Sequence, residues 1–149
     1  MRISNDAQAA IFRLNKSSNK YEFLVLYRFD KEKNEDHYRL LKGGIKLGET
    51  PKRAIVREVE EEVGIKDALI VTDLYQYSYI VGEVLHNVRV FLINAKDVGD
   101  NLKIDSAEEG VFTIKSAKWL NQEKAIEQLN FLEEKKVIEL ASHYLEEKA

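Results

Sequence analysis

Three glutamates stand close together in residues 50–63, where the sequence predicts a helix. Glu58, Glu61 and Glu62 follow an i, i+3, i+4 spacing, which on a helix brings their carboxylates to one face. Like charges at this spacing destabilise a helix unless a cation neutralises them. Carboxylate oxygens are hard ligands that suit Mg²⁺ or Mn²⁺ rather than zinc or copper. The spacing therefore predicts a metal site, although such a run is also typical of a solvated helix face.

Two neighbouring features favour the metal site. The glycine-rich approach at residues 43–48 suits a backbone that must come close to a metal or a phosphate. Arg57 lies beside the carboxylates, where its guanidinium could orient Glu49 and Glu61 through paired hydrogen bonds. Together these residues favour a cation-binding site over a plain solvated helix face.

The helix that carries the carboxylates has predicted ends. Thr50 supplies a capping hydroxyl, and Pro51 follows at the first helical position. Gly64 tolerates the left-handed conformation that often ends a helix. The local sequence therefore predicts a helix over residues 50–63.

Short apolar or alternating runs predict strands around this helix, in two hairpins that turn at residues 15–20 and at Gly82. Residues 30–36 are polar and predict a loop. The predicted strands are residues 9–14, 21–28, 68–81, 84–93 and 111–114. Helical spacing of apolar residues predicts two further helices at residues 122–129 and 133–145. This order predicts an α/β (α+β) fold with helices packed on a mixed sheet.

Composition limits the functions to consider. The chain has 149 residues, a net charge of -3 and no cysteine. Its length predicts a single domain over residues 1–149. The weak negative charge argues against a scaffold that binds nucleic acid by bulk attraction, so an anionic substrate needs local cations or a metal. The lack of cysteine, signal-peptide pattern and membrane-length apolar run predicts a cytoplasmic protein without a membrane partner.

Residues 43–65 are similar to the signature of the Nudix hydrolase family, G-x5-E-x7-R-E-U-x-E-E-x-G-U, in which U is aliphatic. Every specified position matches, namely Gly43, Glu49, Arg57, Glu58, Val59, Glu61, Glu62, Gly64 and Ile65. The resemblance implies an α/β/α sandwich with a mixed β-sheet. It also implies hydrolysis of a nucleoside diphosphate linked to another group, by attack of metal-activated water on phosphorus.

The same resemblance implies roles for the matching residues. Glu58, Glu61 and Glu62 would bind Mg²⁺, or Mn²⁺, together with a backbone carbonyl of the Gly43 region. Glu49 would support a ligand or a water, and Arg57 would hold the glutamates in place.

The family varies in its general base, which is a glutamate of the helix in some members and of a later loop in others. Glu108 and Glu109 are the candidates for a loop base in this sequence. The alternative is a plain exposed acidic loop.

Residues outside the signature are candidates for substrate binding. Arg28 ends an apolar strand and Lys42 precedes the glycine pair, so either cation could meet phosphate, and a solvated strand-end arginine is the alternative for Arg28. Tyr75, Tyr77 and Tyr79 alternate along one strand and therefore face one side. Tyr77 and Tyr79 are the candidates to stack on a nucleobase, and the alternative for all three is to cap the hydrophobic core.

The Lys42-Gly43-Gly44 sequence resembles the diadenosine polyphosphate hydrolase and RNA 5′-pyrophosphohydrolase branches, which favours a nucleoside or dinucleoside polyphosphate as substrate. An RNA 5′ end is the alternative substrate, and a non-catalytic nucleotide sensor is a third hypothesis. A homodimer is possible, since family members are often dimers. The RNA hypothesis would be favoured if five basic residues clustered beside the site, namely Lys16, Lys20, Arg28, Lys31 and Lys33.

Overall fold

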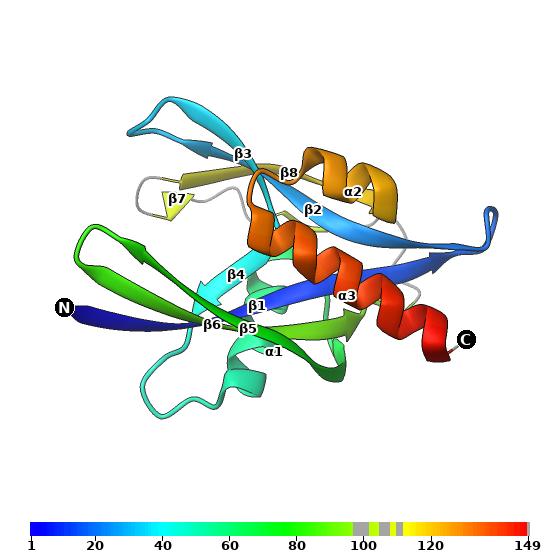
Figure 1. Cartoon of the computed structure of the whole chain (residues 1–149), viewed down its shortest axis with the longest axis horizontal. Helices are drawn as coiled ribbons and strands as arrows, with labels where there is room; N and C mark the ends of the chain where they lie inside the picture. Colours follow the sequence, from blue (N-terminus) through cyan, green and yellow to red (C-terminus); the bar gives the residue numbers. More distant parts are fainter. Residues whose placement is uncertain (97–101, 105–107, 110–111, 149) are drawn as a thin grey trace.

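The computed structural model of the chain describes residues 1–96, 102–104, 108–109 and 112–148. One β-sheet forms its centre, and helices cover both faces (Figure 1). The strands are β1 (Arg2–Asn15), β2 (Lys20–Asp30), β3 (Glu35–Arg39), β4 (Leu41–Gly44), β5 (Leu69–Val81), β6 (Val84–Asn94), β7 (Glu108–Glu109) and β8 (Phe112–Asn121). The helices are α1 (Pro51–Val63), α2 (Gln122–Gln128) and α3 (Leu132–Lys148).

The sheet is mixed, because β1 pairs with its neighbours in both directions. The described strands run in the order β5-β6-β1-β2-β8-β7, while β3 pairs with β2 and β4 pairs with β1. β1 is parallel to β6 and antiparallel to β2 and β4. The short strand β4 therefore lies beside the N-terminal half of β1, with Ala7 opposite Gly43.

Alternation along β1 builds a core on each face of the sheet, since successive side chains of a strand point to opposite sides. On one face the small residues of β1 pack against α1, in a cluster that includes Ala7, Ala9, Ile11, Ala54, Ile55, Val59 and Val63. On the other face β1 packs with α2 and α3, in a cluster that includes Ala10, Phe12, Ala125, Val137, Ile138 and Ala141. Figure 1 shows α3 in front of the strands and α1 behind them. The predicted α/β/α sandwich is confirmed.

The ends of α1 are formed by the predicted residues. The Thr50 side chain accepts a hydrogen bond from the Arg53 N–H at 3.2 Å, and Pro51 begins the helix. Gly64 ends it with a φ of 74°, in the left-handed region, and its N–H donates to the Glu60 carbonyl. Only glycine adopts this conformation without steric cost. The predicted helix over residues 50–63 is confirmed.

Both predicted hairpins and both C-terminal helices are also confirmed, but two strands are longer than predicted. β1 begins at Arg2 because its first half pairs in parallel with β6, and the polar residues Asp6 and Gln8 of this half are buried in side-chain networks. The predicted loop at residues 30–36 is the turn of a third hairpin, since β3 starts at Glu35. β8 continues from the predicted strand to Asn121, while Val111 lies outside the described residues.

The helices of the described segments are too short or too polar to cross a membrane.

Candidate active site

The predicted carboxylates lie on α1, but they differ in exposure. Glu58 and Glu62 are 8% and 4% exposed, because this side of the helix turns toward the sheet. The Glu61 side chain is 54% exposed. The spacing therefore brings two glutamates into the protein interior and leaves one at its surface.

Arg57 joins the segment before α1 to the helix. Its Nε and Nη2 donate to the two oxygens of Glu49 at 2.7 and 2.9 Å, the paired geometry that suits a guanidinium and a carboxylate. Its Nη1 donates to Glu58 at 2.8 Å and to Glu61 at 3.2 Å. Nη2 also donates to the Gly44 carbonyl at 3.1 Å. One arginine thus holds three carboxylates and the end of β4.

This arrangement changes the proton affinity of Glu49. Hydrogen bonds from Arg57 and from the Lys46 backbone N–H lower the pKa of Glu49 from its usual 4.5 to about 2. The pKa of Arg57 is raised in turn, chiefly by its bond to Glu49. Glu49 is therefore ionised at any physiological pH and keeps its acceptor role.

Any side chain at Gly43 would force the Glu58 side chain to move. A Cβ atom built on Gly43 would overlap the Glu58 carboxylate, whereas one built on Gly44 would meet nothing. The missing side chain lets Glu58 lie directly against the β4 backbone. The end of β4 and the first of the α1 glutamates therefore form one contact.

Within the described ranges, no three His, Cys, Asp or Glu side chains gather closely enough to hold a metal ion. Arg57 takes one oxygen of Glu58 and one of Glu61. The other oxygen of each accepts no hydrogen bond from a described residue. Carboxylate oxygens are the ligands that Mg²⁺ prefers, so the chemistry of the donor set fits this metal.

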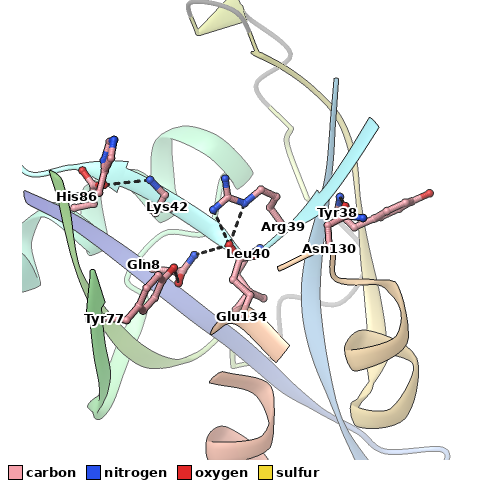
Figure 2. Close-up of polar contacts among 10 residues, drawn as sticks. Gln8, Tyr38, Arg39, Leu40, Lys42, Tyr77, His86, Asn130 and Glu134 are labelled. Carbon is pink, nitrogen blue, oxygen red and sulfur yellow. Dashed lines mark hydrogen bonds and ion pairs between the residues drawn. The ribbon is translucent and has the colours of Figure 1, made fainter. Parts of the chain in front are cut away.

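The predicted phosphate ligand Lys42 lies on the opposite face of the sheet, in the group shown in Figure 2. Its Nζ donates to Asp6 at 3.1 Å, and His86 Nδ1 lies 2.8 Å from the same oxygen. Burial raises the pKa of Asp6, but the charge of Lys42 and hydrogen bonds from His86 and Ser4 outweigh it, so the pKa is lowered. Lys42 is thus paired with a carboxylate and separated from α1 by the sheet.

The three tyrosines of β5 share this second face and pack against its core. The Tyr77 ring has a stacked ring on each side, with centroids 5.9 Å from Tyr75 and 6.1 Å from Tyr79. Its hydroxyl donates to Gln8 at 2.8 Å, and burial raises its pKa. Tyr79 also stacks on His86, with planes 8° apart. Core packing accounts for Tyr77, and Tyr79 lies at the end of the row.

The other predicted residues lie on β2 and β7. Arg28 pairs with His37 across the β2–β3 hairpin, further along the strand whose Leu24 and Leu26 pack on the α1 face of the sheet. Glu108 and Glu109 form β7, and their side chains are outside the described part of the structure.

The five basic residues do not form one cluster. Lys16 and Lys20 lie at the β1–β2 turn, whereas Lys31 and Lys33 follow the other end of β2. An 11-residue strand separates the two groups, a span of roughly 36 Å at about 3.3 Å per residue.

Sequence reasoning missed Glu134, which is completely buried in the first turn of α3. Its carboxylate accepts hydrogen bonds from Arg39, Gln8 and the Leu40 backbone. A signal was present, because Glu134 precedes the buried residues Ile138, Ala141 and Leu145 at helical spacing and thus lies on the apolar side of α3.

Known proteins resemble this chain in sequence pattern and in fold. A family model described as the NUDIX domain matches residues 5–141. A C. elegans Ap4A hydrolase in a binary complex superposes with a TM-score of 0.81 at 22% identity, over 97% of this chain and 98% of that chain. The E. coli dihydroneopterin triphosphate pyrophosphohydrolase gives a TM-score of 0.70 at 15% identity, over 97% and 99% of the two chains.

The NUDIX domain of Shewanella oneidensis NrtR, complexed with ADP ribose, gives a TM-score of 0.69 at 14% identity, over 97% of this chain and 90% of that one. No curated protein sequence matches the chain. At these identities the superpositions show the fold, and the family model spans most of the chain. This protein therefore belongs to the Nudix family.

Proposed function

We propose that the protein is a Mg²⁺-dependent pyrophosphohydrolase of nucleoside or dinucleoside polyphosphates, with its catalytic centre at the N-terminal half of the signature and along α1. The observation that carries this proposal is the imbalance of charge around Arg57. One guanidinium faces the carboxylates of Glu49, Glu58 and Glu61. Such a group attracts a further cation, and an anionic substrate needs one to approach.

Glu58, Glu61 and Glu62 would hold the metal, with a carbonyl of the Gly43 region. Bound Mg²⁺ stabilises charge on phosphoryl oxygens and makes water a better nucleophile at neutral pH. Mn²⁺ prefers the same oxygen donors.

The residues of this chain orient the metal ligands and deprotonate the attacking water. Arg57 is anchored by its bonds to Glu49 and to the Gly44 carbonyl, and it orients Glu58 and Glu61 through its Nη1. Because the described acidic side chains do not lie close enough together to hold a metal ion, the three glutamates would have to move together when a metal binds. The proton of the attacking water passes to a carboxylate. Glu61 is the most exposed candidate on the helix, and Glu108 and Glu109 are the candidates on the later segment.

Two structurally similar proteins support this substrate class. The neighbour with the TM-score of 0.81 is an Ap4A hydrolase, and another is a triphosphate pyrophosphohydrolase. Ap4A and dihydroneopterin triphosphate are both polyphosphates, joined to a nucleoside and to a pterin. Tyr79 and Lys42, whose Nζ lies 5.4 Å from the ring centroid, are on the face of the sheet opposite α1 and are therefore not part of the proposed site.

The test is a product analysis of the purified protein with Mg²⁺ in ¹⁸O-labelled water. The panel contains dinucleoside polyphosphates, nucleoside triphosphates, ADP-ribose, sugar nucleotides and 5′-triphosphorylated RNA. We expect the fastest turnover on a polyphosphate nucleotide, with ¹⁸O in a phosphate product because water attacks phosphorus. Fastest turnover on RNA ends would replace the substrate assignment, and inactivity on the whole panel would favour a nucleotide sensor.

A further inference from the structure

Glu134 brings together residues from three parts of the chain, on the face of the sheet opposite α1. Its Oε2 accepts hydrogen bonds from Arg39 Nε and Nη2 at 3.0 and 2.7 Å and from Gln8 Nε2 at 3.2 Å. Its Oε1 accepts the Leu40 backbone N–H at 2.8 Å. Figure 2 shows these four residues, hereafter the Glu134 cluster, converging on one carboxylate. A buried carboxylate is costly unless it is paired and hydrogen-bonded, and this one is both.

The backbone contact lies where the chain changes partners. β3 pairs with β2 and ends at Arg39, while β4 pairs with β1 and begins at Leu41. Leu40 is the residue between them, and its N–H is bound by α3 instead of by a strand. The first turn of α3 therefore holds the point at which the chain leaves one strand pairing and enters the other.

Two neighbouring contacts hold the same segment. Asn130, just before α3, accepts the Tyr38 N–H through its side chain and donates its own N–H to the Tyr38 carbonyl at 3.3 Å. The Arg39 guanidinium lies over the Phe131 ring at 4.3 Å. These contacts bind residues 38–40 to the start of α3.

The segment held in this way leads directly to the catalytic side. β4 has four residues, and Gly43 is its third. Gln8 of the Glu134 cluster lies on β1 directly beside Lys42 of β4, the residue before Gly43. On the other face, the Glu58 carboxylate occupies the space that a Gly43 side chain would need. A small shift of β4 would therefore separate Gly43 from Glu58 or force them into overlap.

We infer that Glu134 is a positioning residue of the enzyme. From α3 it fixes the start of β4, and β4 in turn places Gly43 and the Gly44 carbonyl against Glu58 and Arg57 of α1. The catalytic consequence of this inference rests on the proposed function, whereas its structural part does not. The alternative is that Glu134 only stabilises the fold, like any buried ion pair.

The test compares four variants with the wild-type protein. Glu134→Ala removes both acceptors, and Glu134→Gln keeps an amide oxygen that can accept the Leu40 N–H. Glu133→Gln is the matched control in the same turn, because Glu133 is exposed and, among the residues that the structure describes, its side chain accepts a hydrogen bond only from the Tyr75 hydroxyl. Val137→Ala removes core packing from the same helix but removes no hydrogen bond of the Glu134 cluster.

The first measurement is amide hydrogen exchange of the metal-free protein. In Glu134→Ala we expect exchange at residues 40–44 to accelerate about tenfold or more, while exchange in α1 is unchanged. The second is steady-state kinetics with Mg²⁺, in which kcat falls about 10- to 100-fold with KM within about twofold, as for supporting residues of metal sites. Glu134→Gln recovers part of both effects, and Glu133→Gln shows neither.

Three results would overturn the inference. One is unchanged exchange at residues 40–44 in a folded Glu134→Ala or Glu134→Gln protein. Another is a loss of kcat in Val137→Ala equal to that in Glu134→Ala at equal stability. The third is a fall in kcat that follows only the folded fraction. If Glu134→Ala does not fold, Glu134→Gln decides by the same criteria. Wild-type inactivity on the substrate panel would defeat the proposed function, and the exchange result would still decide whether Glu134 positions β4.

Discussion

The two faces of the sheet each carry a buried acidic group and an arginine, but with opposite stoichiometry. On the α1 face, one guanidinium serves three carboxylates, those of Glu49, Glu58 and Glu61. On the α3 face, one carboxylate, Glu134, receives four donor groups and is paired with Arg39. The first group is left with an excess of negative charge, and the second is neutral and fully hydrogen-bonded.

This difference separates a group that can bind a ligand from one that supports the fold. Unfilled carboxylate oxygens near the surface can accept a cation at little cost. A buried carboxylate with all its acceptor sites occupied gains nothing from a further partner, and it orders the segments that supply its donors. The same residue types therefore serve different functions. A group with more carboxylates than arginines can bind a cation, and a group whose single carboxylate is fully paired supports the fold.

The largest expected effect comes from removing one negative charge from the α1 face. Glu61→Gln should lower Mg²⁺-dependent turnover by about 10³-fold, or about 4 kcal/mol, because an oxygen ligand of the metal loses its charge. The fold should be unaffected, since the Glu61 side chain is 54% exposed. The matched control is Glu60→Gln, an exposed neighbour on the same helix. Steady-state kinetics measures the turnover of both variants, and thermal unfolding measures their stability. Near-normal turnover in Glu61→Gln would show that Glu61 is not a metal ligand.

The glycine pair tests whether the faces are joined through β4. Gly43→Ala should destabilise the protein by about 1–3 kcal/mol and reduce turnover, because the new methyl group overlaps the Glu58 carboxylate. Gly44→Ala has open space, so its stability should stay equal or rise by up to about 1 kcal/mol. Urea denaturation measures the unfolding free energy of both variants. Equal effects of the two substitutions would contradict the close contact of Gly43 with Glu58.

The smallest expected effect is a pH dependence confined to the α1 face. Because the folded pKa of Glu49 is about 2 and its usual value is 4.5, its ion pair with Arg57 stabilises the native state above pH 4.5. That contribution disappears as pH falls from 4.5 toward 2. The difference in unfolding free energy between wild type and Glu49→Gln should therefore be constant near neutral pH and narrow in this window. A difference that stays constant down to pH 2 would exclude Glu49 as the titrating group.

Local patterns predicted what depends on near neighbours in the sequence. The ends of α1 follow from Thr50, Pro51 and Gly64, whose preferences act within one helical turn. The signature placed Arg57 beside Glu49 because the two residues are eight positions apart in the sequence and the start of a helix lies between them. The hairpins and the helices that pack on the sheet followed from alternation and helical spacing in the same way.

Long-range partners could not be predicted. Lys42 meets Asp6 from 36 residues away, and this pairing removes it from the α1 face, where the motif alone suggested a phosphate contact. The first half of β1 was missed because Asp6 and Gln8 look like surface residues until their partners are known. Which polar side chain is buried depends on the fold, and only Glu134 carried a hint, by its place among the apolar residues of α3.

The separation between Leu40 and Glu134 also has a consequence in time. The two residues are 94 positions apart, and a ribosome adds about 5–20 residues per second. The acceptor for the Leu40 N–H is therefore synthesised roughly 5 to 20 s after its donor. During that interval the nascent chain already contains β4 and α1, with all the signature residues, but not the helix that binds the start of β4. The order of synthesis thus delays completion of the Gly43 site until α3 has emerged and docked.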